Sequence, residues 1–267
     1  MWNYFNGRLK PLLPPQAADG GPDADEECVG RPPNLAACFR SGDARTNQQV
    51  PLVALHTIHS REHNRIAATL SALNPHWQGA RVFEEARRIH IAQVQHILLN
   101  EYLPILLGGK QMKLYNLLES NLGEYFDGYE PTTQAAVSQE FAAAAFRQGH
   151  SSVPSNVFRV STQTRLPTRV YRLRELFRRP WPLFEPLALD EFLLGSTEFA
   201  AQSVDPFVSA ELSGHLLEEP NEQVGLDLIA INIQRGKLEA ASFSSLSMFS
   251  SSLARPSATT NFARSSL

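Results

Sequence analysis

The chain has 267 residues, of which 43% are hydrophobic and 19% are charged. This composition is typical of a globular chain with a sizeable core, organised as one large domain or two small ones. The net charge of −3 gives no sign of a nucleic-acid-binding surface or a polybasic membrane surface. No apolar run reaches the roughly 18 residues that a membrane span requires. We therefore expect no nucleic-acid partner and no membrane span, and MWNYFNGRLKPLLPP lacks the pattern of a signal peptide.

Turn-forming residues dominate the first 44 positions, which include PLLPP and DGGPDADEE, and this segment is expected to wrap irregularly around the fold. A long helix is predicted from about residue 50 to residue 73, with Thr46 or Asn47 as its cap and Pro51 in its first turn. The apolar stripe of this helix comprises Leu52, Leu55, Ile66, Leu70 and Leu73.

A second helix is predicted over residues 80–107, where apolar residues recur at helical spacing up to a Gly-Gly pair. Its expected inward side chains are Val82, Phe83, Ala86, Ile89, Ile97 and Leu98. An alanine-rich pattern predicts a third helix over residues 132–149, and two more are predicted over residues 205–218 and 223–235. Strand signals are few, so the predicted fold class is mainly α.

The character of the chain changes from Lys237 onward. Residues 237–267 are rich in serine and show no amphipathic period. A segment of this composition cannot bury enough apolar surface to offset the entropy of ordering it, so it is predicted to be a disordered tail. The folded part is then expected within residues 1–236.

The chain contains two cysteines, Cys28 and Cys38, on either side of the short loop VGRPPNLAA. A local disulfide would fit this spacing, and the chain-entropy model gives so small a loop about 2–3 kcal/mol of stabilisation. Two free, buried thiols in a cytosolic protein would fit equally, because two cysteines alone do not identify the redox compartment. The residues leave both states open.

His59, Glu62 and His63 form the pattern His-x-x-Glu-His, which occurs in one class of zinc peptidases. The two histidines share one face of a helix, and Glu62 would act as a base beside a zinc-bound water. His56, one turn earlier, offers a third nitrogen. Two neighbouring arginines oppose a dication, however, and short patterns of this kind arise by chance. Histidines that only pack on the helix are therefore the simpler interpretation.

Three longer motifs follow one another in a fixed order. They are SGDARTNQQ with REHNR inside residues 38–65, AFRQGH at residues 145–150, and GLDLIAINIQRG at residues 225–236. Together they resemble the animal haem peroxidase superfamily, of the peroxidasin and chorion peroxidase type, over about residues 3–236. The resemblance implies a partial haem peroxidase domain over residues 1–236, cut at both ends. Its expected fold is a mainly α, multi-helix core with long irregular connections, incomplete in this chain.

The resemblance assigns roles to five residues. His150 matches the proximal ligand of the haem iron, and Asn232 matches the asparagine that hydrogen-bonds its other ring nitrogen and fixes the tautomer. Arg147 and Arg235 match positions beside the haem propionates, where a guanidinium pairs well with a carboxylate. Arg45 matches the distal arginine, which stabilises negative charge on the leaving oxygen when peroxide is cleaved. Taken alone, each of these arginines reads as a surface charge of little energetic weight.

The chain departs from the family pattern at Gln48, where members with covalently attached haem carry a glutamate that forms an ester. An amide cannot form that ester, so haem b is expected to be held non-covalently on this side. The distal histidine of the family and its calcium loop precede the segment that matches residues 41–49, and this chain contains neither; its first histidine is His56. Loss of such an acid–base group typically costs on the order of 10²–10⁴ in rate. Asp43 is expected to be a structural partner or a cap.

By resemblance, the function is oxidation of a reduced donor by hydrogen peroxide at a haem bound to His150, and the donor is a small molecule or a protein tyrosine. The resemblance also implies a role in the response to oxidative stress, a secreted protein, and pairing of Cys28 with Cys38. Activity is expected to be impaired, because the distal histidine is absent. The alternative is a non-catalytic haem-fold fragment or pseudoenzyme. A zinc hydrolase that uses the His-x-x-Glu-His pattern is the less favoured alternative.

Overall fold

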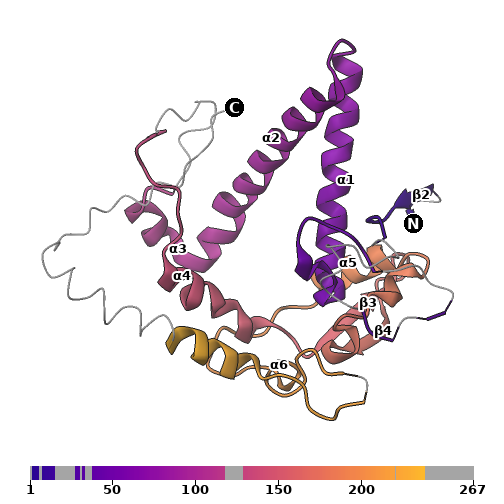
Figure 1. Ribbon diagram of the computed structural model, residues 1–267, viewed down its shortest axis with the longest axis vertical. Coiled ribbons are helices and arrows are strands. Elements are labelled where there is room, and N and C mark those ends of the chain that lie inside the picture. The colour runs from indigo at the N-terminus through magenta and orange to yellow at the C-terminus, as the bar shows by residue number, and fades with distance from the viewer. Residues whose placement is uncertain are drawn as a thin grey trace, which may run out of the picture. The chain divides into compact units, whose positions relative to one another are not determined.

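The computed structural model describes residues 2–5, 8–15, 28–30, 32–33, 38–117, 129–219 and 221–237, and their fold is mainly helical, as predicted (Figure 1). The chain divides into two compact units. The first unit comprises Met1–Ser60 with Gln139–Phe243, and the second comprises Arg61–Ser138 with Ser244–Leu267. Apart from its first residue, the predicted serine-rich tail lies outside the described residues.

Helix α1 spans Val50–Leu73, as the sequence predicted, and follows a short 3-10 helix, η1, at Ala44–Gln48. Thr46 and Asn47, which were expected to cap α1, lie instead within η1. Phe39 N donates to Asn47 Oδ1 at 3.1 Å, and Asn47 Nδ2 donates to Phe39 O at 2.7 Å. The residues that α1 buries almost completely are Val50, Val53, Ala54, Thr57 and Ile66.

The predicted apolar stripe of α1 was therefore partly wrong. Ile66 is buried, but Leu55 is 49% exposed and Leu73 is 72% exposed. Helical spacing correctly indicates that one face is apolar, yet the neighbouring elements select which residues of that face are covered. The first unit covers the face that includes Val50 and Val53, which pack with Leu189 and Phe192 in one apolar cluster.

After the second half of α1, the second unit contains three consecutive helical segments. Helix α2 spans Gly79–Ile97, a π-helical turn, η2, spans Leu98–Tyr102, and α3 spans Leu103–Leu114. The helix breaks at the predicted Gly-Gly pair, where Gly108 has φ of 73°, but further helical turns, which the sequence did not predict, follow the kink to Leu114. Glycine adopts this left-handed conformation without a steric penalty, so the chain bends there and resumes its helix.

The side chains buried in this unit come from both sides of the π-helical turn. Leu99, Met112 and Leu117 form its apolar cluster, with Leu103 packed against them. Val82 and Ala86 of α2 are buried as expected, whereas Phe83 is 51% exposed and Ile97 is 49% exposed. The inward face predicted for the second helix is thus half correct.

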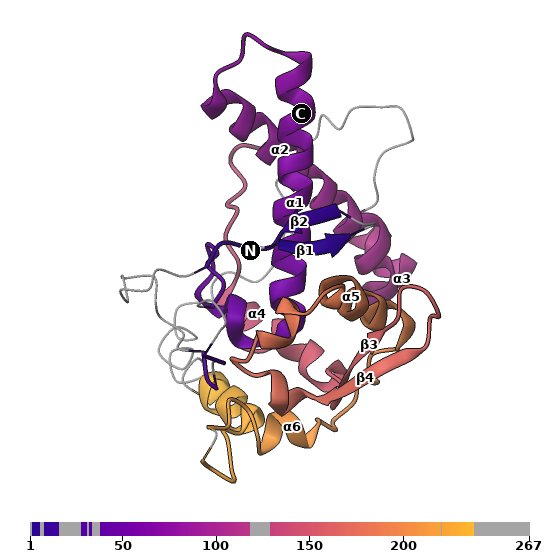
Figure 2. The ribbon, with the colours of Figure 1, turned by 90° about the vertical axis from the view of Figure 1, so that its right-hand side faces the viewer.

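Two antiparallel hairpins belong to the first unit, and the sequence predicted neither. Strand β1 (Trp2–Phe5) pairs with β2 (Arg8–Pro11), and β3 (Asn156–Val160) pairs with β4 (Pro167–Arg172). Helix α5 (Ala188–Glu198) packs against β3, and both views show it beside the β3–β4 hairpin (Figures 1 and 2). The 3-10 helices η4 and η5 span Leu173–Leu176 and Trp181–Phe184.

Three predicted helices are shorter than the sequence suggested. The segment expected over 132–149 contains α4 (Gln139–Ala143) and the 3-10 helix η3 (Ala145–Ser152), and residues 134–138 form no regular element. Helix α6 covers only Ala210–Ser213, because the Ser209 side chain caps its start by accepting from Glu211 N at 3.2 Å. The last predicted helix is observed at residues 228–237.

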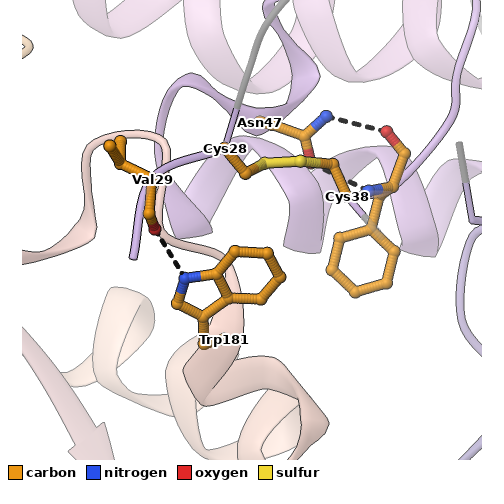
Figure 3. The surroundings of a disulfide bond; sticks show 6 residues. Cys28, Val29, Cys38, Asn47 and Trp181 are labelled. Carbon is orange, nitrogen blue, oxygen red and sulfur yellow. Dashed lines mark hydrogen bonds between the residues drawn. A yellow bond between two sulfur atoms is a disulfide. The ribbon is translucent and has the colours of Figure 1, made fainter. Parts of the chain in front are cut away.

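Cys28 and Cys38 form a disulfide, with their Cα atoms 6.1 Å apart (Figure 3). The segment that follows Cys28 is fastened to the first unit by two hydrogen bonds: Trp181 Nε1 donates to Val29 O at 2.8 Å, and Val29 N donates to the backbone oxygen of Arg178 at 2.9 Å. Within the part of the chain that the structure describes, no helix is long and apolar enough to cross a membrane.

Candidate functional site

His150, Asn232 and Arg147 form one hydrogen-bonded group, although 82 residues separate the histidine from the asparagine. Asn232 Nδ2 lies 2.8 Å from His150 Nδ1, and Arg147 Nη1 donates to Asn232 Oδ1 at 2.9 Å. Helix η3 supplies His150 and Arg147, and the helix at residues 228–237 supplies Asn232. The fold thus brings together three of the five residues to which the family resemblance gave a role.

An apolar cluster packs against the segments that carry His150 and Asn232. Leu228 and Ile231, on the helix of Asn232, pack against a buried group that also contacts Val153, three residues after His150. The buried members of the cluster are Leu173, Phe177, Leu212 and Leu216. Because the same cluster contacts both supporting segments, it holds the two polar side chains in hydrogen-bond range.

The start of the Asn232 helix is fixed by its own residues. Asp227 Oδ1 accepts from Ile229 N at 2.8 Å and from Ala230 N at 3.1 Å, so Asp227 satisfies two of the free donors at the helix start. Just before it, Gly225 leaves no room for a side chain, because a Cβ atom there would lie 2.6 Å from the carbonyl carbon of His215. An aspartate just before an apolar helical pattern is a known start signal, so the sequence could have identified Asp227.

The surroundings of His150 favour a neutral imidazole. The side chain is partly buried. Burial, and to a lesser extent the positive charge of Arg147, lowers the pKa of His150 below its usual value of 6.5. The ring is therefore uncharged at neutral pH, which is the form that coordinates metals. Among the described residues, Nδ1 is the ring nitrogen of His150 that has a hydrogen-bond partner.

Arg147 is only partly satisfied in this arrangement. Its Nη1 bonds to Asn232, but its buried Nε atom has no hydrogen-bond partner within the described part of the chain. Arg235 lies three residues after Asn232 on the same helix and is exposed. An unsatisfied buried guanidinium nitrogen is a suitable donor for a carboxylate oxygen.

Arg45 belongs to a different group of side chains. Its Nε donates to Asp43 Oδ1 at 3.0 Å and its Nη2 to Asp43 Oδ2 at 2.8 Å, with 74% of the arginine side chain exposed. Asp43 also accepts from Arg45 N and caps η1, so the expected structural role of Asp43 is confirmed. These hydrogen bonds lower the pKa of Asp43 well below its usual value. Gln48 ends η1, and its backbone oxygen accepts from Arg178 N at 3.1 Å.

The His-x-x-Glu-His pattern lies on α1, and its carboxylate is engaged with other side chains. Glu62 accepts two hydrogen bonds from Arg65, both at 2.7 Å, and one from Gln93 at 3.1 Å. The Arg65 hydrogen bonds lower the pKa of Glu62 to about 2. His63 packs its ring against Phe83. Among the residues that the structure describes, no three His, Cys, Asp or Glu side chains are grouped as metal ligands would be.

A surface cavity of about 810 Å³ lies elsewhere in the first unit, lined in part by Tyr171, Trp181 and Phe184. Arg169 stacks its guanidinium over the Tyr171 ring at 4.5 Å from the centroid. None of the five selected residues lines this cavity. The cavity is therefore separate from the His150 group.

Several known proteins are similar to this chain. The family model for animal haem peroxidase matches residues 3–241. Peroxidasin of Drosophila melanogaster is 37% identical over 233 residues, which cover 86% of this chain and 14% of that protein. Chorion peroxidase of Aedes aegypti is 37% identical over 205 residues, which cover 77% of this chain and 25% of that protein. The chain thus spans about a quarter or less of the length of these curated relatives.

Solved structures share the fold. Peroxidase A of Dictyostelium discoideum superposes with a TM-score of 0.65 at 29% identity, covering 84% of this chain and 40% of that one. A fatty acid alpha-dioxygenase of Oryza sativa superposes with a TM-score of 0.52 at 14% identity, over 71% of this chain and 36% of that one, which is a likeness of fold alone. Because the family match extends over most of the sequence and the fold agrees with it, this chain belongs to the animal haem peroxidase family.

Proposed function

We propose that this chain binds haem through His150 and contributes to the oxidation of a reduced donor by hydrogen peroxide. The observation that carries the proposal is the Asn232–His150 contact, with 2.8 Å between the amide and Nδ1. An outer partner on one ring nitrogen leaves the other nitrogen for a metal and orients the ring. The family membership of the chain supports the same proposal.

The residues around His150 fit a haem group. The imidazole is held neutral, and Nε2 has no hydrogen-bond partner among the described residues, so Nε2 is the ring nitrogen that a metal would approach. The buried Nε of Arg147 has no hydrogen-bond partner among the residues that the structure describes, which suits a propionate carboxylate. When bound, the haem would supply the redox chemistry that cleaves peroxide.

The side chains of the chain would divide the remaining work. His150 would hold the iron, and Asn232 would orient its imidazole; Arg147 and Arg235 would bind the propionates. Arg45 would stabilise negative charge on the departing peroxide oxygen, for which its guanidinium would have to leave Asp43, with which it forms an ion pair in the structure. The side chain at position 48 is an amide, so haem b is held there without a covalent bond.

The proposed substrates are hydrogen peroxide and a small reducing donor or a protein tyrosine. We also propose that the protein is secreted and acts in the response to oxidative stress. Two relatives are named chorion peroxidase and peroxidasin, and the Cys28–Cys38 disulfide is consistent with an oxidising compartment. The zinc alternative is not favoured, because the Glu62 oxygens are engaged by Arg65 and Gln93.

A haem titration tests the proposal. Haem added to the wild-type protein should give a saturable Soret band with the spectrum of histidine ligation, and His150→Ala should abolish it. His76→Ala, at an exposed position between α1 and α2, is the matched control and should bind as the wild type does, and circular dichroism should show that all three proteins are folded. A spectrum that is the same in the wild type and in folded His150→Ala would reject His150 as the ligand.

A further inference from the structure

The orientation of the Asn232 amide is determined by Arg147. A guanidinium can only donate hydrogen bonds, so the Asn232 atom that faces Arg147 Nη1 at 2.9 Å has to be the carbonyl oxygen. The NH₂ group of the same amide then faces Nδ1 of His150 at 2.8 Å. Because this NH₂ group donates, the Nδ1 atom has to accept and carries no proton.

This arrangement places the proton of the neutral His150 ring on Nε2. A metal bound at Nε2 requires the opposite tautomer, in which Nδ1 carries the proton and needs an acceptor. Asn232 can provide that acceptor only if its amide turns over, which would direct its NH₂ group at Arg147. Two donors would then face each other, so Arg147 and an acceptor-oriented amide exclude one another.

Arg147 can also leave Asn232 with the loss of only a single hydrogen bond to this residue. It makes one hydrogen bond to Asn232 through Nη1, and its buried Nε has no partner in the described part of the chain. A carboxylate would engage Nε and an Nη atom together, which is the arrangement that guanidinium groups prefer. Arg147 would therefore make more hydrogen bonds to an incoming carboxylate than it makes to Asn232.

We propose that Arg147 is a latch on the Asn232 amide, which a carboxylate of the incoming ligand opens by drawing the guanidinium away from Oδ1. The amide then turns over and accepts from Nδ1 of His150. In the same step one proton leaves Nε2 for solvent and one enters Nδ1 from solvent, so the charge of the ring is unchanged. The inference rests on the proposed function, because haem is the ligand that would bring the carboxylates.

The haem-free protein allows a first test by nitrogen-15 NMR of the imidazole rings, with the His150 signals identified by their loss in His150→Gln. The wild type should carry the proton on Nε2. In Arg147→Met a population with the proton on Nδ1 should appear, and in Asn232→Asp, where only an acceptor remains, this form should dominate. Arg87→Met, which removes an exposed arginine of α2, should match the wild type. A proton on Nδ1 in the wild type, or no change in Arg147→Met, would overturn the latch.

A second test compares haem with haem dimethyl ester, whose carboxylates are blocked, by Soret titration. If the latch holds about nine molecules in ten, Arg147→Met should bind the ester about tenfold more tightly than the wild type does. An arginine that merely contacts a propionate predicts equal ester affinities, and that result would reject the latch. If neither compound binds through His150, the proposed function fails, whereas the NMR experiment still decides whether the latch exists.

Discussion

Gly195 shows how closely one residue can control packing in the first unit. It lies in α5 where this helix contacts β3, and a Cβ atom at this position would lie 1.9 Å from the carbonyl oxygen of Phe158. Neither backbone can move away without disturbing the apolar cluster on which α5 packs. A glycine is therefore required here for close approach, not for a special backbone angle.

We predict that Gly195→Ala destabilises the protein by about 1–3 kcal/mol, because the new methyl group forces α5 away from β3. The matched control is Gly109→Ala in α3, where a Cβ atom meets no other atom within 4 Å and alanine favours the helix. Urea unfolding followed by circular dichroism measures both. Equal midpoints for the two variants would show that α5 does not approach β3 as closely as described.

At the scale of elements, one ion pair joins η4 to α6. Arg174 donates to Glu211 from Nε and Nη2, both at 2.7 Å, and from its backbone nitrogen at 3.0 Å. Burial alone would raise the pKa of Glu211, but the hydrogen bonds from Arg174 outweigh it and lower this pKa below 4.5. The pair stabilises the fold only while Glu211 is ionised.

Glu211→Gln should therefore lower the free energy of unfolding by about 1.5–3 kcal/mol at neutral pH. The pKa is depressed in the folded state, so this contribution is complete above pH 4.5 and is lost as the pH falls through the lower folded value. Urea titrations at several pH values should show the wild type and the variant converging in acid. Glu84→Gln, in an exposed pair on α2, should change stability by less than about 0.5 kcal/mol, and a pH-independent gap would contradict the assignment.

The disulfide connects the segment around Val29 to the segment that leads into α1. The double variant Cys28→Ser/Cys38→Ser should lose about 2–3 kcal/mol, since closing a loop of this size removes a corresponding entropy from the unfolded chain. Thermal unfolding with and without a reductant measures the effect. The reduced wild type should match the double variant, and a reductant should leave the variant unchanged. If the oxidised wild type were no more stable than the double variant or than the reduced wild type, the disulfide would not stabilise the fold.

The sequence predicted elements well where local chemistry decides them and poorly where packing does. The bounds of α1 follow from its apolar period and from the Asn-Pro turn after Leu73, and both were readable. The β3–β4 hairpin was missed because an arginine interrupts β3 and most residues of β4 are exposed, so no clean alternation marks either strand and pairing defines them. The His150–Asn232 contact was accessible only through family resemblance, since spacing does not reveal a contact between residues so far apart in sequence.

At the scale of the whole molecule, haem binding should be linked to folding. Haem bound to the folded chain but not to the unfolded one adds about 2.7 kcal/mol at a free concentration one hundred times its Kd, which raises Tm by roughly 5–10 °C. Differential scanning calorimetry should show this increase in the wild type and not in His150→Ala. An equal increase in both proteins would mean that the haem binds elsewhere.

The π-helical turn at Leu98–Tyr102 sets the rotational phase of everything that follows it in the second unit. Such a turn holds one residue more than an α-helical turn, and it ends two residues before Pro104, which has no amide hydrogen to donate to the preceding turn. Each residue advances an α-helix by about 100°. Removal of Asn100 would therefore rotate α3 by roughly that angle against α2. Met112 would then turn away from Leu99, so one apparently surplus residue determines which side of α3 faces the interior.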